Sequence, residues 1–274
     1  MLTKRPLSRR NLDLAIEREW GRDGYVRART VMANAVVGQM LPEGAVKGGS
    51  ALKLRLGEGT TRFTTDLDVA RRGSLEGFVD AMNDLLAEGW EGFTGRLVER
   101  EPPRPAGIPS GYVMKPYEVK LSYAGKPWVT VPLEVGHDEI GDADEPERRI
   151  SADVVAMFVR LGFPEPAPVP LMPLSHQVAQ KLHALSSPGS ERAHDLVDLQ
   201  LIARDCPLDL PSTAGVCRRL FAYRKAQEWP PTIRCGEGWA ELYAEQAEGL
   251  RVLGDVGDAV AWANRLVAEI DRAG

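Results

Sequence analysis

The sequence has few of the residues that build disulfide frameworks and transition-metal sites. Its 274 residues include four histidines and three cysteines, Cys206, Cys217 and Cys235. The cysteine count is odd and no two cysteines have the Cys-x-x-Cys spacing, which argues against a disulfide-stapled domain or a structural zinc site. Reduced thiols of this kind are typical of the cytoplasm, where we expect the protein to act.

Long apolar runs are also missing. No run approaches the roughly 20 residues that a membrane-spanning helix needs. The first 20 residues are basic and lack the apolar core of a secretory signal. We therefore expect no membrane partner. The composition, 43% hydrophobic and 27% charged, is that of an ordinary globular protein with one large domain or two modest ones.

An excess of positive charge is absent as well, since the formal net charge is −5. The charge is uneven, however. Residues 1–30 carry eight basic and four acidic groups, whereas residues 138–147 carry six acidic groups and no basic one. This asymmetry fits a side of the molecule that faces a polyanion, and it fits equally well a solvated helix and a solvated loop.

Hydrophobic periodicity predicts a mixed α/β core between helical segments. We expect two helices within residues 8–41, broken at Gly21–Gly24 and capped at Ser8 or Asn11. Further expected elements, in chain order, are a short helix over 50–56, a strand over 62–70, a helix over 74–89, a strand over 93–101, a loop over 102–111, a hairpin over 117–136 with a four-residue connection, and a short helix near 151–161.

The second half of the chain reads differently. After the proline-rich segment 162–173, strand signals vanish and every remaining segment has a helical pattern. The predicted divisions are therefore N-terminal helices over 1–42, an α/β core over 43–140, a linker with a short helix over 141–172, and a helical domain over 173–274.

A Gly-Gly-Ser turn opens the α/β core. Gly48 and Gly49 lack side chains, which lets a phosphate approach the backbone N–H groups, and Ser50 adds a hydroxyl donor. A helix that begins here would place its electropositive end at the same point. The same three residues also occur in ordinary turns, so this motif leaves both interpretations open.

Two aspartates follow on the predicted strand. Asp66 and Asp68 are two residues apart, so in a strand both side chains project to one face, together with Thr64. Two carboxylates this close repel each other unless a cation lies between them, and Mg²⁺ binds a few carboxylates together with phosphate oxygens. The alternative is a polar strand face in water.

The combination of these segments is more specific than its parts. A Gly-Gly-Ser turn, a short helix and an Asp-x-Asp strand are typical of the DNA polymerase β-like nucleotidyltransferase superfamily. With the two downstream helical motifs, the chain resembles the AbiEii/MenT family of nucleotidyltransferase toxins. The residues that match the four family motifs are Lys47, Gly48, Gly49 and Ser50; Arg62, Thr64, Asp66 and Asp68; Lys181, Leu182, Ala184 and Leu185; and Arg192, Asp195, Leu196, Asp198 and Leu199.

The resemblance implies an α+β fold: a polymerase β-like core with a mixed sheet, N-terminal helices and an all-helical C-terminal half. It also implies that Gly48, Gly49 and Ser50 hold the triphosphate of a nucleoside triphosphate (NTP), and that Asp66 and Asp68 bind Mg²⁺ in a two-metal site. Glu134 is the candidate third carboxylate, with Glu118 and Asp138 as weaker candidates.

Other residues receive roles by the same resemblance. Lys181 pairs with a phosphate, although by its residue type alone it would be a surface lysine. Asp195 is preferred over Asp198 as a site residue that binds the nucleotide or orients Lys181. Arg62 contacts phosphate or fixes its loop, and Thr64 is a candidate point of regulation by phosphorylation.

The function that the resemblance implies is that of a toxin. It would transfer a nucleoside monophosphate from an NTP to the 3′ end of tRNA and so block translation, with a cognate antitoxin as its partner. One alternative is transfer to a protein hydroxyl or to a small molecule such as an aminoglycoside, which the acidic pI of about 5.6 fits at least as well. Another is a non-catalytic nucleotide-binding module, against which the presence of both Asp66 and Asp68 argues.

Overall fold

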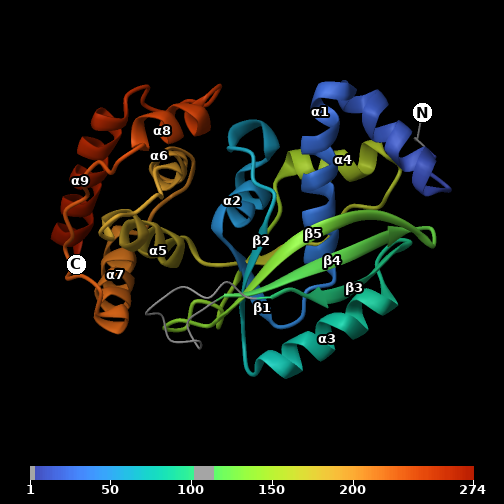
Figure 1. Cartoon of the computed structure of the whole chain (residues 1–274), viewed down its shortest axis with the longest axis horizontal. Helices are drawn as coiled ribbons and strands as arrows, with labels where there is room; N and C mark the ends of the chain where they lie inside the picture. Colours follow the sequence, from blue (N-terminus) through green and yellow to red (C-terminus); the bar gives the residue numbers. More distant parts are fainter. Residues whose placement is uncertain (1–3, 102–113) are drawn as a thin grey trace. The chain divides into compact units, whose positions relative to one another are not determined.

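The computed structural model describes residues 4–101 and 114–274, so the expected loop over 102–111 lies outside the described residues. The chain forms two compact units (Figure 1). Unit 1 comprises Met1–Glu58 and Thr64–Met172, and unit 2 comprises Gly59–Phe63 and Pro173–Gly274. The chain therefore enters unit 2 for five residues, immediately before the segment that carries Asp66 and Asp68.

Unit 1 is built on a mixed seven-stranded sheet with the order β3-β4-β5-β2-β1-β7-β6. β2 pairs antiparallel with β1 and parallel with β5. With helices at both ends of the chain, this confirms the α+β fold with a mixed sheet. The strands are β1 (Gly44–Lys47), β2 (Leu67–Arg71), β3 (Phe93–Glu99), β4 (Lys115–Tyr123), β5 (Lys126–His137), β6 (Glu147–Arg149) and β7 (Val169–Leu171).

The helices of unit 1 are α1 (Arg9–Gln39), α2 (Gly48–Leu56), α3 (Leu75–Glu88) and α4 (Ala152–Arg160), with a 3₁₀ turn at Glu58–Thr60. The Ser8 side chain caps α1 as expected, and the Ser74 side chain caps α3. The break predicted at Gly21–Gly24 is present as a kink inside α1, because Gly21 leaves the helical conformation with φ 70° and ψ 173°. The predicted short helix is α2, which ends at Gly57.

The expected strand over 62–70 is shorter in the structure and begins at Leu67. Its last pair with β1 is Lys47↔Asp68, and its first pair with β5 is Leu67↔Leu133. β1 ends there because α2 begins at Gly48. Asp66 thus precedes the strand, and only Asp68 lies within it.

The hairpin and the proline-rich segment also correct the sequence-based picture. The connection between β4 and β5 has two residues, Ala124 and Gly125, both with positive φ (48° and 72°), as short hairpin turns require. The strands β6 and β7 were not predicted because each has three residues and they lie in the acidic and proline-rich segments. In β7, Pro170 lies opposite Arg148 of β6, and β7 pairs with β1 only at Val46↔Leu171.

Unit 2 is helical throughout its second stretch of chain, as predicted. Its helices are α5 (Leu174–Ser186), α6 (His194–Asp205), α7 (Leu210–Arg224), α8 (Trp239–Ala247) and α9 (Val256–Ala273). Large side chains such as Phe221, Trp239 and Tyr243 are buried in its core. Over the described ranges 4–101 and 114–274, none of the helices combines the length and apolar character needed to cross a membrane.

Candidate functional site

The Gly-Gly-Ser turn lies directly against one of the predicted metal carboxylates. Strand β1 ends at Lys47, and α2 begins at Gly48 with φ +66°. A Cβ atom on Gly48 would lie 2.3 Å from Oδ2 of Asp68, which is far inside van der Waals contact. Lys47 has no acceptor oxygen with which to cap the helix, so the first backbone N–H groups of α2 depend on other acceptors. The N-terminus of a helix and a carboxylate therefore meet at one point.

Ser50 fixes the backbone beside the other aspartate. Its hydroxyl donates to the backbone carbonyl of Asp66 and accepts from Nδ2 of Asn34 at 3.3 Å. The side chain is buried. Because a hydroxyl has one proton and Ser50 donates it to Asp66, this arrangement leaves the Ser50 hydroxyl without a proton for a phosphate. The role of Ser50 in phosphate binding stays a prediction.

The carboxylates meet at the ends of two neighbouring strands. Asp68 on β2 is the register partner of Glu134 on β5, so both side chains project from the same face of the sheet. Asp66, exposed just before β2, accepts a hydrogen bond from the Thr65 hydroxyl at 2.8 Å.

These carboxylates fit a hard cation that is shared with a substrate. Within residues 4–101 and 114–274, no group of three or more His, Cys, Asp or Glu side chains is placed to hold a metal by itself. Mg²⁺ usually binds one or two carboxylates and completes its shell with waters and phosphate oxygens. Asp66 and Asp68 match this chemistry, and the share of Glu134 stays a prediction.

Unit 2 contains a buried cluster of charges around Lys181. Lys181 is 4% exposed, so it is not the surface lysine that its residue type suggests. It donates to Oδ1 of Asp195 and to Oδ2 of Asp198, both at 2.7 Å. Arg62 bonds both oxygens of Asp198 at 2.9 and 3.1 Å, and Arg192 bonds Asp195 at 2.9 Å.

Electrostatic pairing outweighs burial throughout this cluster. Burial alone lowers the pKa of Lys181, but the carboxylates of Asp195 and Asp198 raise it overall. Burial likewise raises the pKa of each aspartate, and the Lys181 ammonium overcomes this, so both pKa values are lowered. Burial lowers the pKa of His194 to about 4, so its imidazole is neutral at pH 7. The cluster is therefore ionised at neutral pH while His194 is not.

The cluster bears on the alternatives that the sequence left open. Arg62 belongs to unit 2, and its guanidinium fixes the segment Gly59–Phe63 to Asp198 on α6. Asp195 and Asp198 both bond Lys181, so the geometry does not rank one above the other. The spacing of the two aspartates three residues apart on a helix is the sequence signal that could have predicted a shared partner.

The predicted site residues thus fall into two groups. Unit 1 holds Gly48, Gly49 and Ser50 in the first turn of α2, and the segment with Thr64, Asp66, Asp68 and Glu134 on or beside β2 and β5. Unit 2 holds Arg62, Lys181 and Asp195. Lys53 and Arg55, on α2 beside this site, instead form ion pairs with Glu58 at 2.6 Å and Glu147 at 2.5 Å.

Comparisons with known proteins give one family and one fold. The profile of the AbiEii nucleotidyl transferase toxins, a type IV toxin–antitoxin system, matches residues 32–263. MenT4, a nucleotidyltransferase toxin from Mycobacterium tuberculosis, superposes with a TM-score of 0.58 at 18% identity, over 94% of this chain and 89% of that one. JHP933 from Helicobacter pylori has a TM-score of 0.44 at 15% identity, over 90% and 91% of the two chains. The comparison with curated proteins found no match.

Proposed function

Because the chain belongs to the AbiEii family of nucleotidyltransferase toxins of type IV toxin–antitoxin systems, we propose that it transfers a nucleoside monophosphate from an NTP to the 3′ end of tRNA. Such an addition would block aminoacylation and hence translation in the cytoplasm. The observation that carries the proposal is the contact between Gly48 and Asp68, where an added Cβ would lie 2.3 Å from the carboxylate. This contact joins a helix N-terminus suited to a triphosphate with a carboxylate suited to its metal ion.

Each residue of unit 1 has a task in this reaction. The backbone N–H groups at Gly48, Gly49 and Ser50 hold the triphosphate, and Asp66 and Asp68 hold Mg²⁺, in a site for two ions. When bound, the divalent cation offsets the negative charge that develops on the phosphate oxygens. The 3′ hydroxyl oxygen of the acceptor forms a bond to the α-phosphorus, and the bond to pyrophosphate breaks. The hydroxyl proton passes to a carboxylate, for which Glu134 is the candidate.

The family resemblance gives Lys181 the role of phosphate partner. Lys181 has three N–H donors, and two of them bond Asp195 and Asp198. We assign the third donor to a phosphate oxygen of the nucleotide. Asp195 then acts as a positioning residue that holds the ammonium in place, and Arg62 keeps Asp198 in the same network.

Thr64 is the proposed point of regulation. Its hydroxyl is buried and has no hydrogen-bond partner among the described residues. A phosphate added there would bring about two negative charges next to the metal carboxylates, which would oppose binding of an anionic nucleotide. Modification would require this hydroxyl to become exposed. A cognate antitoxin is the expected partner of the toxin, whether it acts through modification of Thr64 or in a different way.

Transfer of label from an α-labelled NTP tests the proposal. The purified chain is incubated with Mg²⁺ and each of the four NTPs in turn, with total tRNA, a protein extract or an aminoglycoside as acceptor. Asp66→Ala is the matched inactive control. We expect label on tRNA with the native chain and none with the variant. Label on protein or on the aminoglycoside alone would show that the acceptor is wrong, and binding of NTP without transfer to any acceptor would contradict an enzymatic role.

A further inference from the structure

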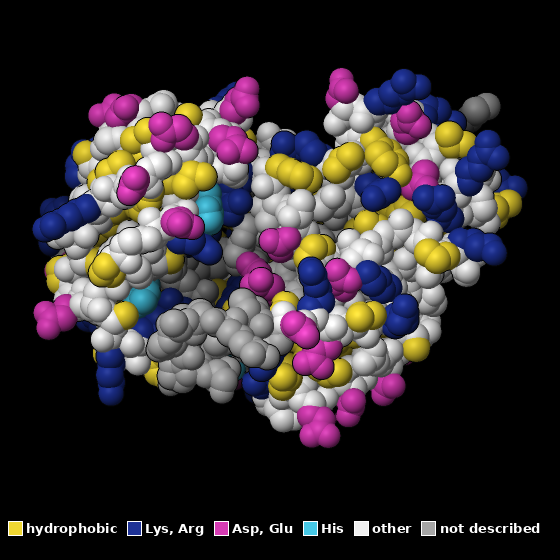
Figure 2. Space-filling view, viewed as in Figure 1, with side chains coloured by type: hydrophobic (Ala, Val, Ile, Leu, Met, Phe, Trp, Pro, Cys, Tyr) yellow, Lys and Arg dark blue, Asp and Glu magenta, His cyan; other side chains and the backbone are white. Residues whose placement is uncertain are grey.

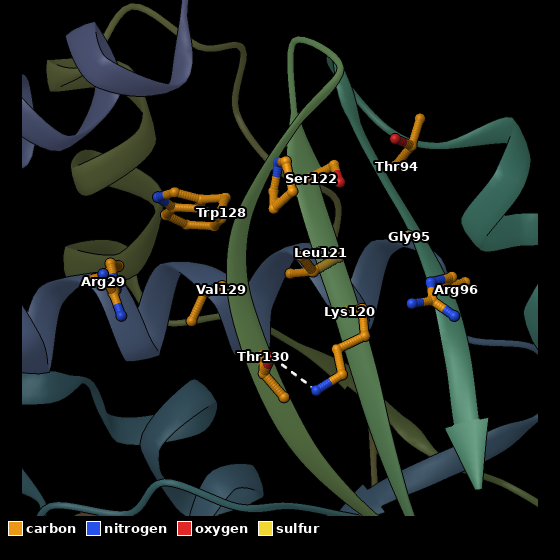
Figure 3. A pocket seen from close by; sticks show the side chains of 11 residues that line it. Arg29, Thr94, Gly95, Arg96, Lys120, Leu121, Ser122, Trp128, Val129 and Thr130 are labelled. Carbon is orange, nitrogen blue, oxygen red and sulfur yellow. Dashed lines mark hydrogen bonds between the residues drawn. The ribbon is translucent and has the colours of Figure 1, made fainter.

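A groove on the sheet of unit 1 is lined by cations and hydroxyls. Its volume is about 480 Å³, and it lies over β3, β4 and β5 beside α1 (Figure 3). None of the described residues that line it is acidic, although the whole chain has a net charge of −5. Figure 2 shows basic and acidic side chains together over the region of these strands. Its cationic and hydroxyl side chains are those of Arg29, Arg96, Lys120, Thr94, Ser122 and Thr130.

The strand register places these groups in ordered rows. Arg96, Lys120 and Thr130 are directly opposite one another across β3, β4 and β5, so their side chains share one face. Lys120 donates to the Thr130 hydroxyl at 3.3 Å. Thr94 and Ser122 form the next pair. Two neighbouring rows of this face therefore present cations and hydroxyls, and the next row toward Glu134 consists of Val98, Glu118 and Pro132.

The cations are available to an anion to different degrees. The Arg96 side chain is exposed. Arg29 is held in place by Tyr25, to whose hydroxyl it donates at 3.1 Å. Lys120 forms an ion pair with Glu118. Arg100 forms a second ion pair with the same carboxylate, in which its Nη1 lies 3.5 Å from the carboxylate oxygen. The surplus positive charge favours an anionic occupant.

The same sheet face leads to the candidate active site. Thr130 and Glu134 are four residues apart on β5, so their side chains project to the same side and lie about 13 Å apart along the strand. Glu134 is the register partner of Asp68. A stacked nucleic-acid strand rises about 3.4 Å per nucleotide, so roughly four nucleotides would cover this distance.

We propose that the Arg29–Arg96–Lys120 groove binds the phosphate backbone of the nucleic-acid acceptor a few nucleotides before its reacting 3′ end. This inference rests on the proposed function for the identity of the acceptor. Trp128, the aromatic residue among those lining the groove, is 5% exposed and donates its indole N–H to Asp13 at 2.9 Å. It offers no open ring on which a base could stack. The contacts are therefore to phosphate and are independent of base sequence.

The test compares two double variants of equal charge change. Arg96→Ala/Lys120→Ala removes two groove cations, and Lys126→Ala/Arg149→Ala removes two exposed cations outside the groove. Binding of a fluorescent RNA with a duplex stem and a single-stranded 3′ extension is measured by anisotropy without NTP, at several salt concentrations. Affinity falls as salt rises, and the groove variant should make the slope of log affinity against log salt less steep by about 1.4. Each of the two lost contacts to a single-strand phosphate accounts for about 0.7 of this change. The KM of the groove variant for RNA should rise several-fold with the KM for NTP unchanged.

A variant that exchanges the two cations without changing the charge shows whether the loss of binding comes from lost charge or from damage to the fold. Arg96→Lys/Lys120→Arg should retain the native slope, because the number of cations near the phosphates is the same. If the alanine variant kept the native slope, or if the Lys126/Arg149 control lost as much of the slope, the groove would not be the binding surface. This conclusion would hold even if label were still transferred to tRNA. A lowered slope without any transfer to tRNA would instead leave the groove standing and contradict the proposed acceptor. Displacement of the RNA from the groove by NTP alone would also count against the proposal.

Discussion

Replacing Gly48 by alanine should separate backbone strain from damage to the site. The new Cβ would lie 2.3 Å from Oδ2 of Asp68, whereas ordinary contacts are 3.4 Å or more. The carboxylate must then move by roughly 1 Å. A misplacement of this size at a reacting centre costs about 100-fold in rate. Because φ at this position is +66°, the substitution should also destabilise the fold by about 1–2 kcal/mol.

Gly73 provides the matched control. Its φ is +70°, and a Cβ there would have nothing within 4 Å. Gly73→Ala should therefore cost a similar 1–2 kcal/mol in stability and leave the transfer rate nearly native. Urea denaturation measures the first effect, and label transfer at saturating NTP measures the second. If the two variants lost activity equally, the contact between Gly48 and Asp68 would not be part of the site.

Four further outcomes follow from buried groups. Lys181→Met should destabilise the protein by about 3–5 kcal/mol, because it leaves Asp195 and Asp198 buried without their cation; a loss below about 1 kcal/mol in urea denaturation would argue against the cluster. The lowered pKa values of these two aspartates stabilise the fold above about pH 4, and this stability should be lost as the pH falls further. Burial raises the pKa of Asp142 to about 8, so its contribution to stability should decline from about pH 4 up to pH 8. The Asp142→Asn variant should lack this decline and be more stable than the native chain at pH 7.5. A steeper decline in the variant would contradict the raised pKa of Asp142. Thr64→Glu should lower the transfer rate in the label assay, and full activity would count against regulation at this residue.

Segments with strong hydrophobic periodicity were predictable from sequence. The capped helix α3 and the last helix of unit 2, α9, each bury one apolar stripe, and both are present. The three-residue strands β6 and β7 are too short to show a period. Their existence depends on partners distant in sequence, and the start of β2 at Leu67 depends on where β1 and β5 pair with it.

The candidate site shows the same limit. The motifs identified Gly48 and Asp68 separately, but their contact follows from the antiparallel pairing of β1 with β2, which no local pattern specifies. Lys181 looked like a surface lysine because its residue type is usually exposed. Its burial follows from two carboxylates on α6 and from Arg62, whose segment packs with unit 2. The sequence therefore identified the residues of this cluster, but it could not show that they lie close enough together to bond one another.

The most direct test of the central claim is transfer to a defined acceptor atom. Intact tRNA and tRNA whose 3′-terminal hydroxyls have been destroyed by periodate are each incubated with the native chain, Mg²⁺ and α-labelled NTP. The account predicts label on the intact tRNA, release of pyrophosphate in equal amount, and no label on the oxidised tRNA. Equal labelling of both tRNAs would contradict transfer to the 3′-terminal hydroxyl. The same holds if neither tRNA is labelled while the chain still labels another acceptor.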